Sequence, residues 1–402
     1  MSRYDVVVWG ATGFTGRLVA EYLAEHRPDN LRWALGGRSE QKLREVRTGL
    51  AALDSRLADL PILVGDSHDR AALDAIVTQT RVMCTTVGPY ARYGSELVAA
   101  CVEAGIGYCD LNGEVPWMRR MIDAHHDRAK QKGARIVFCC GFDSIPSDLG
   151  CFLLQQSARQ RHDRACNRAV LYVDRMRGGA SGGTVASMMN IVDEATRDRE
   201  VRRLLGDPYA LNPEAERSGP DHNEELKPTR TEDGRWTAPF VMAAINTRIV
   251  RRSNALLGYP YGRDFRYAER VRFAAGPKGW LGANAMAAGI GGLMAGLAFA
   301  PTRTLLERVL PSPGEGPSRE QRERGSFLLR IEGDGPGFSV TARVEDSSDP
   351  GYGSTAKMLA ESALCLALDK SSSRTGMLTP ASAMGMTLID RLRRAGLTFD
   401  VA

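Results

Sequence analysis

Lysine is scarce in this chain of 402 residues, which carries seven lysines and 46 arginines. Basic and acidic side chains nearly balance, so the net charge is only +5, and charge alone does not indicate a nucleic-acid partner. Basic segments with interleaved aromatic residues and the motifs of known nucleic-acid readers are also missing. We therefore expect no nucleic-acid binding, and we interpret the arginine excess first as a bias of genome composition.

Metal-ligand patterns are missing as well. The eight cysteines form no C-x-x-C pair accompanied by a second pair or by histidines at ligand spacing, so we expect no metal site. The start of the chain leaves no room for a targeting segment before the first predicted strand. Together with the length and the 43% hydrophobic content, these features predict a cytoplasmic protein with a large core and at least two domains.

The first predicted strand, Asp5–Trp9, is followed at once by a glycine-rich turn and by an amphipathic helix over Arg17–His26. Strand, G-x-x-G-x-x-G turn and helix in this order are the setting of a dinucleotide-binding fingerprint. Gly10 permits the sharp turn, Gly13 lets a pyrophosphate approach the backbone, and Gly16 lets the helix pack closely on the strand. The predicted pyrophosphate-binding residues are Gly10, Ala11, Thr12, Gly13, Phe14, Thr15 and Gly16.

Acidic residues are absent between Leu31 and Ser39, where the second strand is expected to end. An NAD-preferring site usually places an acidic residue there to bind the ribose 2′-hydroxyl. Arg38 and Ser39 occupy the position instead, and an arginine suits the 2′-phosphate of NADP. The sequence therefore favours NADPH/NADP; the alternative is that Ser39 only caps the next helix and Arg38 is a surface charge.

Strand and helix patterns alternate up to about Leu154, which predicts a doubly wound α/β Rossmann domain over residues 1–154. In such a sheet the ligand crevice lies at the carboxyl ends of the strands. We therefore expect the turns after the third, fourth and sixth strands to contact the cofactor. The residues predicted on these turns are Asp66, Val87, Gly88, Pro89, Tyr90 and Phe142.

The motifs GATGFTG, GGRS, TVGPYARYG, DLNGE and CGFDSIPSDLG occur in this order in the first half of the chain. They resemble the saccharopine dehydrogenase-like oxidoreductases. The second half carries SGGTVASM, DPYALNP, NTRIVRRSNAL, YGRDFRY, PSPGEGPSREQRERG and LTPASAMG. These narrow the resemblance, which covers nearly the whole chain, to the trans-acting enoyl reductases of that family.

This resemblance implies an NADPH-dependent reductase of α,β-unsaturated acyl thioesters that works beside a polyketide synthase in complex lipid synthesis. Two alternatives stay open. One is a saccharopine-type amino-acid dehydrogenase acting on a C–N bond, although no clear dicarboxylate pocket is visible in the sequence. The other is a non-catalytic, NADP-binding scaffold associated with lipid.

Enoyl reduction needs an oxyanion stabiliser and a proton source beside the cofactor. Tyr93, Asp143 and Ser144 are the candidate catalytic residues, because they are expected on turns that face the crevice. Tyr93 is favoured as the proton donor, since a phenol stays protonated at neutral pH. Each of the three residues also has a plain structural interpretation as a hydrogen-bonding side chain.

The remainder is predicted to form an α+β domain with a mixed or antiparallel sheet over residues 155–350, and a C-terminal helical segment over 351–402 that packs back on the Rossmann domain. Phe240–Val250 looks strand-like. An acidic acyl-carrier domain, or its phosphopantetheine phosphate, could dock on a nearby arginine cluster; the alternative is a solvated basic face. The cluster consists of Arg248, Arg251, Arg252, Arg263, Arg266, Arg270 and Arg272.

The 22 residues of 279–300 carry no charge, but 13 of them are Gly or Ala. This length could span a bilayer, whereas the small residues give little hydrophobic driving force. Gly292 and Gly296 form a G-x-x-x-G pair suited to close helix contact, for example in a homodimer. We expect a helix that packs on a partner, covers an acyl channel or rests peripherally on the inner face of the plasma membrane, without spanning it.

Overall fold

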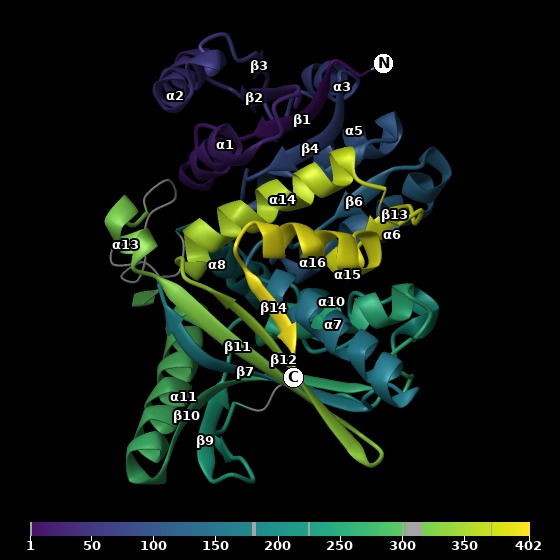
Figure 1. The fold of residues 1–402 in the computed structure, drawn as a ribbon, viewed down its shortest axis with the longest axis vertical. Helices are drawn as coiled ribbons and strands as arrows, with labels where there is room; N and C mark the ends of the chain where they lie inside the picture. The colour runs from purple at the N-terminus through teal and green to yellow at the C-terminus, as the bar shows by residue number, and fades with distance from the viewer. Residues whose placement is uncertain (1, 179–181, 224–225, 300, 303–315, 371) are drawn as a thin grey trace.

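The computed structural model describes the chain except residues 1, 179–181, 224–225, 300, 303–315 and 371. Two seven-stranded sheets lie one beyond the other along the long axis of the molecule, with helices between and around them (Figure 1). The first sheet carries the N-terminal domain, and the second sheet carries most of the remainder.

The first sheet is parallel throughout, in the order β13-β6-β5-β4-β1-β2-β3. Its strands are β1 (Tyr4–Trp9), β2 (Trp33–Gly37), β3 (Ile62–Val64), β4 (Thr80–Thr85), β5 (Gly107–Cys109), β6 (Arg135–Val137) and β13 (Gly376–Leu378). Its helices include α1 (Phe14–His26), α2 (Glu40–Leu53), α3 (Arg70–Val77), α4 (Tyr90–Tyr93), α5 (Ser95–Ala104) and α6 (Val115–Lys132). Central strands buried on both faces are typical of a doubly wound sheet, and the predicted α/β fold is confirmed.

The second sheet is mixed, in the order β14-β12-β11-β7-β10-β9-β8, because β7 and β10 run parallel while the other neighbours are antiparallel. This confirms the predicted α+β character. Its strands are β7 (Arg168–Arg177), β8 (Thr229–Arg230), β9 (Arg235–Pro239), β10 (Arg266–Ala275), β11 (Ser326–Gly335), β12 (Phe338–Asp346) and β14 (Thr398–Val401). The helices of this part are α7 (Ile145–His162), α8 (Gly182–Arg197), α9 (Arg199–Leu205), α10 (Ala243–Leu256), α11 (Gly276–Ala298) and α13 (Arg319–Glu323).

The C-terminal segment belongs to both sheets. Helix α14 (Thr355–Leu368) packs against α1, β1 and β4 of the first domain. The helices α15 (Pro380–Ala383) and α16 (Gly385–Arg394) follow. Strand β13 extends the first sheet beside β6, and β14 extends the second beside β12. The segment was expected to be helical; these two short strands were missed because their pairing partners lie far away in the sequence. The domain boundaries at 154 and 350 stay predictions.

The strand expected over Phe240–Val250 is wrong. Phe240 follows β9, and the residues from Ala243 onward form α10, which packs against α7 and β10. A short apolar run fits a buried helix as well as a buried strand, and its periodicity does not separate the two.

The arginine cluster is not an exposed patch. Arg248, Arg251, Arg252 and Arg270 are buried. The guanidinium of Arg252 donates to the carbonyl oxygens of Leu211 and Met377. Most of these arginines therefore cross-link the interior of the second domain, and neither the docking patch nor the solvated basic face describes the cluster as a whole.

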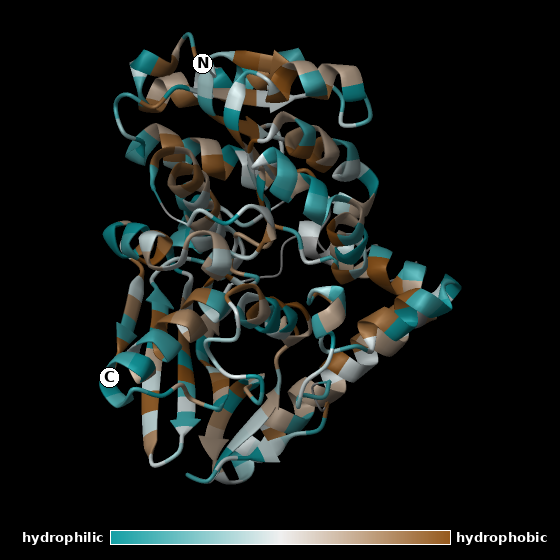
Figure 2. Cartoon of the chain, turned by 90° about the vertical axis from the view of Figure 1, so that its right-hand side faces the viewer, coloured by the Kyte–Doolittle hydropathy of each residue, from teal (hydrophilic) through white to brown (hydrophobic). Residues whose placement is uncertain are grey.

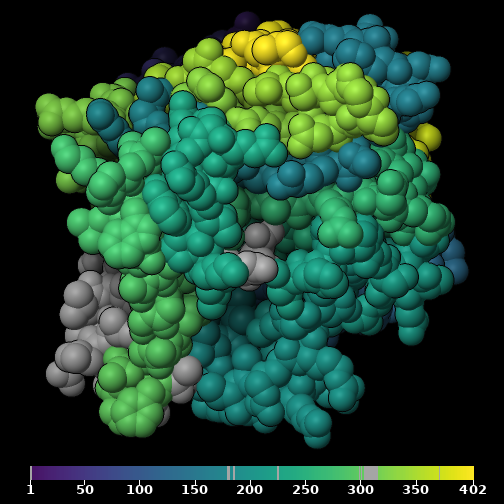
Figure 3. Space-filling model, turned by 90° about the horizontal axis from the view of Figure 1, so that it is seen from below, coloured from purple at the N-terminus to yellow at the C-terminus, as the bar shows by residue number. Residues whose placement is uncertain are grey.

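Helix α11 is a largely exposed apolar helix. Trp280 and Leu281 are 50% and 64% exposed. The helix leaves the second sheet and runs outward toward α8 (Figure 2), and it borders a hollow on the lower face of the molecule (Figure 3). Among the described residues, it holds the one stretch, Gly276–Leu297, that is long and apolar enough to cross a membrane. Strand β10 before it and β11 after it both pair with β7.

Candidate active site

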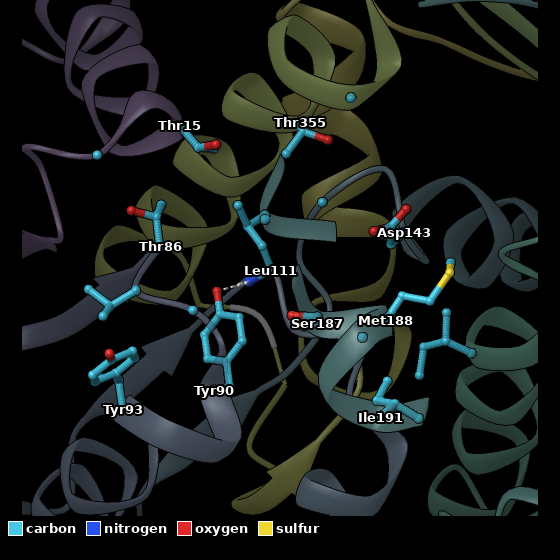
Figure 4. A pocket seen from close by; sticks show the side chains of 18 of the residues that line it. Thr15, Thr86, Tyr90, Tyr93, Leu111, Asp143, Ser187, Met188, Ile191 and Thr355 are labelled. Atoms are coloured by element: carbon cyan, nitrogen blue, oxygen red, sulfur yellow. Dashed lines mark hydrogen bonds between the residues drawn. The ribbon is translucent and has the colours of Figure 1, made fainter. Parts of the chain in front are cut away.

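A cavity of about 1170 Å³ lies between the two sheets and extends over the carboxyl ends of β1 to β4 (Figure 4). Pockets for single small ligands usually measure about 300–1,000 Å³. This cavity therefore has room for a dinucleotide together with part of a substrate. One wall comes from the turns of the first domain, and the opposite wall comes from α8, α10 and α11.

The glycine turn has the geometry of a phosphate cradle. Gly10 has φ +85°, and a Cβ at Gly16 would lie 2.2 Å from the carbonyl oxygen of Gly10, so both positions require glycine. Helix α1 begins after Gly13 with no side-chain cap and no acidic residue in its first turn. Its first N–H groups are therefore available to a pyrophosphate, as the fingerprint predicts.

Eleven of the fifteen predicted cofactor residues line the cavity. They are Gly10, Thr12, Gly13, Phe14, Thr15, Arg38, Asp66, Val87, Gly88, Tyr90 and Phe142. The remaining four, Ala11, Gly16, Ser39 and Pro89, are not in the lining. Ala11 and Gly16 are buried in the packing of α1 on the sheet. Ser39 accepts a hydrogen bond from the N–H of Lys42 as the N-cap of α2, and Pro89 precedes α4 after a cis peptide bond.

Lys42 joins Arg38 in the lining at the end of β2. Sequence reasoning missed it, although a residue four positions beyond Arg38 on a helical start falls on the same side. Two cations thus face the place where the ribose 2′ group of a dinucleotide is expected. Asp66 accepts a hydrogen bond from the N–H of His68 at 2.9 Å, so this carboxylate also shapes its own turn.

Glu114 organises the turn after β4. Its carboxylate accepts hydrogen bonds from the N–H groups of Tyr90 and Ala91 at 2.8 and 2.9 Å, and from the Ser187 hydroxyl at 2.8 Å. The Tyr90 hydroxyl accepts a bond from the N–H of Leu111, and burial raises the pKa of Tyr90 well above its ordinary value. Glu114 therefore joins a cofactor-facing turn of the first domain to α8 of the second.

The three catalytic candidates do not come together. Tyr93 lies beside His68, with ring centroids 5.4 Å apart, on the β3 side of the cavity. Asp143 lies on the opposite side, near Met188 of α8 (Figure 4). Ser144 is fully buried outside the lining, and its hydroxyl donates to Oδ1 of Asn246 at 3.0 Å. Ser144 therefore makes a buried hydrogen bond to α10, and its catalytic role stays a prediction.

Asp143 faces the cavity from the turn after β6, and burial raises the pKa of its carboxyl to about 6. The next residue fixes this turn: Ser144 has φ 131° and donates its N–H to the carbonyl oxygen of Phe142 at 2.8 Å. A positioned carboxyl with a raised pKa can carry a proton near neutral pH.

The second-domain wall is mostly apolar, and sequence reasoning did not find it. Helix α8 contributes a stripe of residues at helical spacing, Gly183, Ser187, Met188, Ile191, Val192, Ala195 and Thr196. Helix α10 adds Ala244, Ile245 and Arg248, and α11 adds Met294. The spacing on α8 is visible in the sequence, but a helix stripe alone does not say whether it faces a core or a ligand.

Metal-binding groups are absent from the part of the chain that the structure describes: no three His, Cys, Asp or Glu side chains come together there as a candidate site. All eight cysteines are buried and free.

The profile of the saccharopine dehydrogenase NADP-binding domain matches residues 6–137. Trans-acting enoyl reductases of Mycobacterium bovis and Mycobacterium ulcerans are each 41% identical to this chain, covering 98% of it and 97% of their own length. A Mycobacterium tuberculosis protein that provisionally bears the same name is 44% identical, covering 99% of this chain and 97% of its own.

Among solved structures, apo saccharopine dehydrogenase (L-Glu forming) from Saccharomyces cerevisiae shares the fold, with a TM-score of 0.52 and 13% identity over 99% of both chains. At this identity the likeness concerns the fold alone. The sequence matches over nearly the full length carry the family assignment, and the expected resemblance is confirmed. The chain belongs to the saccharopine dehydrogenase-like oxidoreductases, in the group of the trans-acting enoyl reductases.

Proposed function

We propose that this protein is an NADPH-dependent reductase of α,β-unsaturated acyl thioesters. The observation that carries the proposal is a single cavity in which a dinucleotide-binding turn, a carboxyl with a raised pKa and an apolar wall meet. The relatives' name, trans-acting enoyl reductase, supports the same reaction. A saturated acyl thioester is the expected product.

The residues of the first domain fit NADP(H). The uncapped start of α1 would hold the pyrophosphate, and Arg38 and Lys42 would hold the 2′-phosphate. The turn Val87–Gly88, held through Glu114, would face the nicotinamide half. When bound, NADPH supplies the hydride that adds to Cβ of the substrate.

We assign the proton step to Asp143. Addition of hydride to Cβ moves the π electrons toward Cα and the thioester oxygen, leaving an enolate. The O–H bond of Asp143 then breaks as the Cα–H bond forms, and the carboxylate regains a proton from water. Its pKa of about 6 keeps a usable fraction protonated near neutral pH.

This assignment moves the favoured donor away from Tyr93. The ring of Tyr93 lies against His68, which follows β3, and β3 is at the opposite end of the sheet from the half that carries β6 and Asp143. The nicotinamide half of a dinucleotide is expected nearer β4 and β5 than β3. We propose that Tyr93 contacts the adenosine half of the cofactor.

We propose the apolar wall as the site of the acyl chain. Met188, Ile191 and Val192 lie on one face of α8, and Met294 of α11 lies in the same lining. Thioether and aliphatic side chains adapt well to a flexible alkyl chain. We further propose that a separate synthase presents the thioester on an acyl-carrier domain, and that the reaction takes place in the cytoplasm or peripherally at the membrane.

The function is tested by following NADPH oxidation with a panel of enoyl thioesters and a matched panel of imino acids. Turnover of the enoyl thioesters, with saturated thioesters as products, supports the proposal. Turnover confined to imino acids would favour a saccharopine-type dehydrogenase. NADPH binding without turnover of either panel would favour the non-catalytic scaffold.

A further inference from the structure

We propose that Arg202 of α9, beside the C-terminal end of α8, binds the phosphate of a phosphopantetheine-linked substrate. This inference rests on the proposed thioester reduction and deepens it. It gives the arm that carries the acyl group a recognition site on this chain, which is distinct from the cofactor site around Arg38.

Helix α8 runs along the cavity, and its first half lies on the cofactor side. At its start, the N–H of Gly182 donates to the hydroxyl of Tyr352, whose ring lies 4.8 Å from that of Phe14 on the glycine turn. One turn later, Ser187 donates to Glu114. The first half of α8 therefore lies beside the turns expected to hold the cofactor.

Arg202 of α9 lies at the other end of α8. Its guanidinium donates to the carbonyl oxygens of Ala195 and Thr196 at 2.7 and 3.3 Å, and all three residues line the cavity. From Met188, which lies near Asp143, to Thr196 the helix rises ~12 Å at 1.5 Å per residue. An extended pantetheine arm is longer than this rise, so a thioester near Asp143 could place its phosphate at this end.

The charged side chains of the lining at this end are arginines. Among the described residues, no carboxylate lies within ion-pair distance of Arg202, whereas the guanidinium of Arg248 already donates to the carbonyl oxygens of Asp207, Ala244 and Leu205. Nearby carboxylates pair with other arginines: Glu194 with Arg120, and Asp207 with Arg217. The hydrogen bonds of Arg202 to described residues come from Nη1 alone, which leaves its Nε and Nη2 donors for a phosphate. An arginine binds phosphate by charge-assisted hydrogen bonds.

The middle of the wall formed by α8 is apolar, so the phosphate is expected at the Arg202 end of the helix. Ile191 and Val192 separate Ser187 from the Arg202 end, and a phosphate is too strongly hydrated to rest on an apolar surface. A substrate with a neutral arm and a terminal phosphate matches this order of polar, apolar and cationic lining. A free fatty acid, whose single charge lies next to its alkyl chain, does not.

The test compares two ligands that differ only in the phosphate: a saturated acyl pantetheine thioester and its 4′-phosphopantetheine counterpart. Binding of each to the full-length protein with NADP⁺ is measured by calorimetry. We expect the phosphorylated ligand to bind roughly tenfold more tightly, the scale of one charged hydrogen bond. Arg202→Ala should remove this preference, Arg202→Lys should keep part of it, and Arg203→Ala should leave it unchanged.

Arg203 is a matched control because it is exposed, adjacent in α9 and absent from the lining. Equal wild-type affinities for the two ligands would overturn the inference, as would an equal loss of preference in Arg203→Ala. Turnover of the corresponding enoyl pair separates the two proposals. Phosphate preference without any reduction would leave the anion site standing and reject the proposed reaction.

Discussion

The carboxylate of Glu114 accepts a hydrogen bond from the Ser187 hydroxyl, with 2.8 Å between the two oxygens, across the boundary between the two sheets. The same carboxylate accepts hydrogen bonds from the backbone N–H groups of Tyr90 and Ala91. Glu114 is 1% exposed, so its oxygens are hydrogen-bonded by these three donors rather than by bulk water. The turn that faces the cofactor and the helix that lines the substrate wall are thus fixed to one side chain.

Replacing Glu114 by Gln should weaken NADPH binding, because the amide NH₂ cannot accept the second backbone N–H. One unsatisfied buried donor costs about 1–3 kcal/mol, so we expect lower thermal stability and severalfold weaker NADPH binding by fluorescence titration. Ser187→Ala keeps both backbone bonds and should leave the cofactor affinity near the wild-type value. Equal losses in the two variants would contradict this division of roles.

Cofactor selectivity should depend on Arg38 and Lys42. Arg38→Asp removes a phosphate donor and adds a repelling carboxylate, so NADPH affinity should fall roughly ten- to hundredfold, with a smaller effect on NADH. Lys42→Ala should show a weaker loss in the same direction. Titrations of both dinucleotides against the wild type and the variants measure the effect. Equal wild-type affinities for NADPH and NADH would reject this role.

The proton donor should determine the pH dependence. Burial raises the pKa of Asp143 to about 6, and the donor must be protonated, so kcat should be constant below that pH and fall about tenfold per unit above it. Asp143→Asn should lower kcat by roughly 10²–10⁴ and abolish the fall of kcat at high pH, while NADPH affinity is retained. Tyr93→Phe should retain most of kcat. The reverse pattern would return the proton step to Tyr93.

Buried Arg252 should matter for stability rather than for docking. It joins α10 to the carbonyl oxygens of Leu211 and of Met377 in β13. Arg252→Ala should lower the free energy of unfolding by about 3 kcal/mol, because charged hydrogen bonds are lost and carbonyls stay buried without donors. Arg266 is exposed and gives a matched control, Arg266→Ala, with little expected effect. Denaturant unfolding of both variants provides the comparison.

Helix α11 should not span a membrane. Strands β10 and β11 flank it in the chain and pair with the same strand, β7, whereas a single span would put them on opposite sides. Protein expressed without detergent should be soluble, or be released from membranes by carbonate washing. Retention in the pellet after that wash would contradict the topology.

The Rossmann half could be predicted from the sequence because its signals are local. The glycine turn, the buried strands and the missing acidic residue near Arg38 all lie within short segments. Ser39 and Pro89 were placed at the correct turns, but only coordinates distinguish a side chain that lines a cavity from one that caps a helix. Lys42 could have been predicted as a neighbour of Arg38, because it follows four residues later at the start of a helix.

The second half was harder to predict because its roles depend on long-range packing. The arginines around Arg252 look like a surface patch in linear order, but their acceptors come from distant segments. Helix α8 is joined to the first domain through contacts distant in sequence, such as the hydrogen bond of Ser187 to Glu114, 73 residues away. No pattern within α8 indicates which of its faces closes the cavity.

Isotope labelling follows the proposed transfer of hydride from NADPH to Cβ of an enoyl thioester. The protein is incubated with NADPH deuterated at C4 of the nicotinamide and an enoyl thioester in ordinary water, and the product is analysed by mass spectrometry and NMR. We expect a saturated thioester with one deuterium at Cβ and a solvent proton at Cα. A thioester that stays unreduced or is reduced without label would contradict this transfer, as would label incorporated only in a parallel incubation with an imino acid, at the carbon bearing nitrogen.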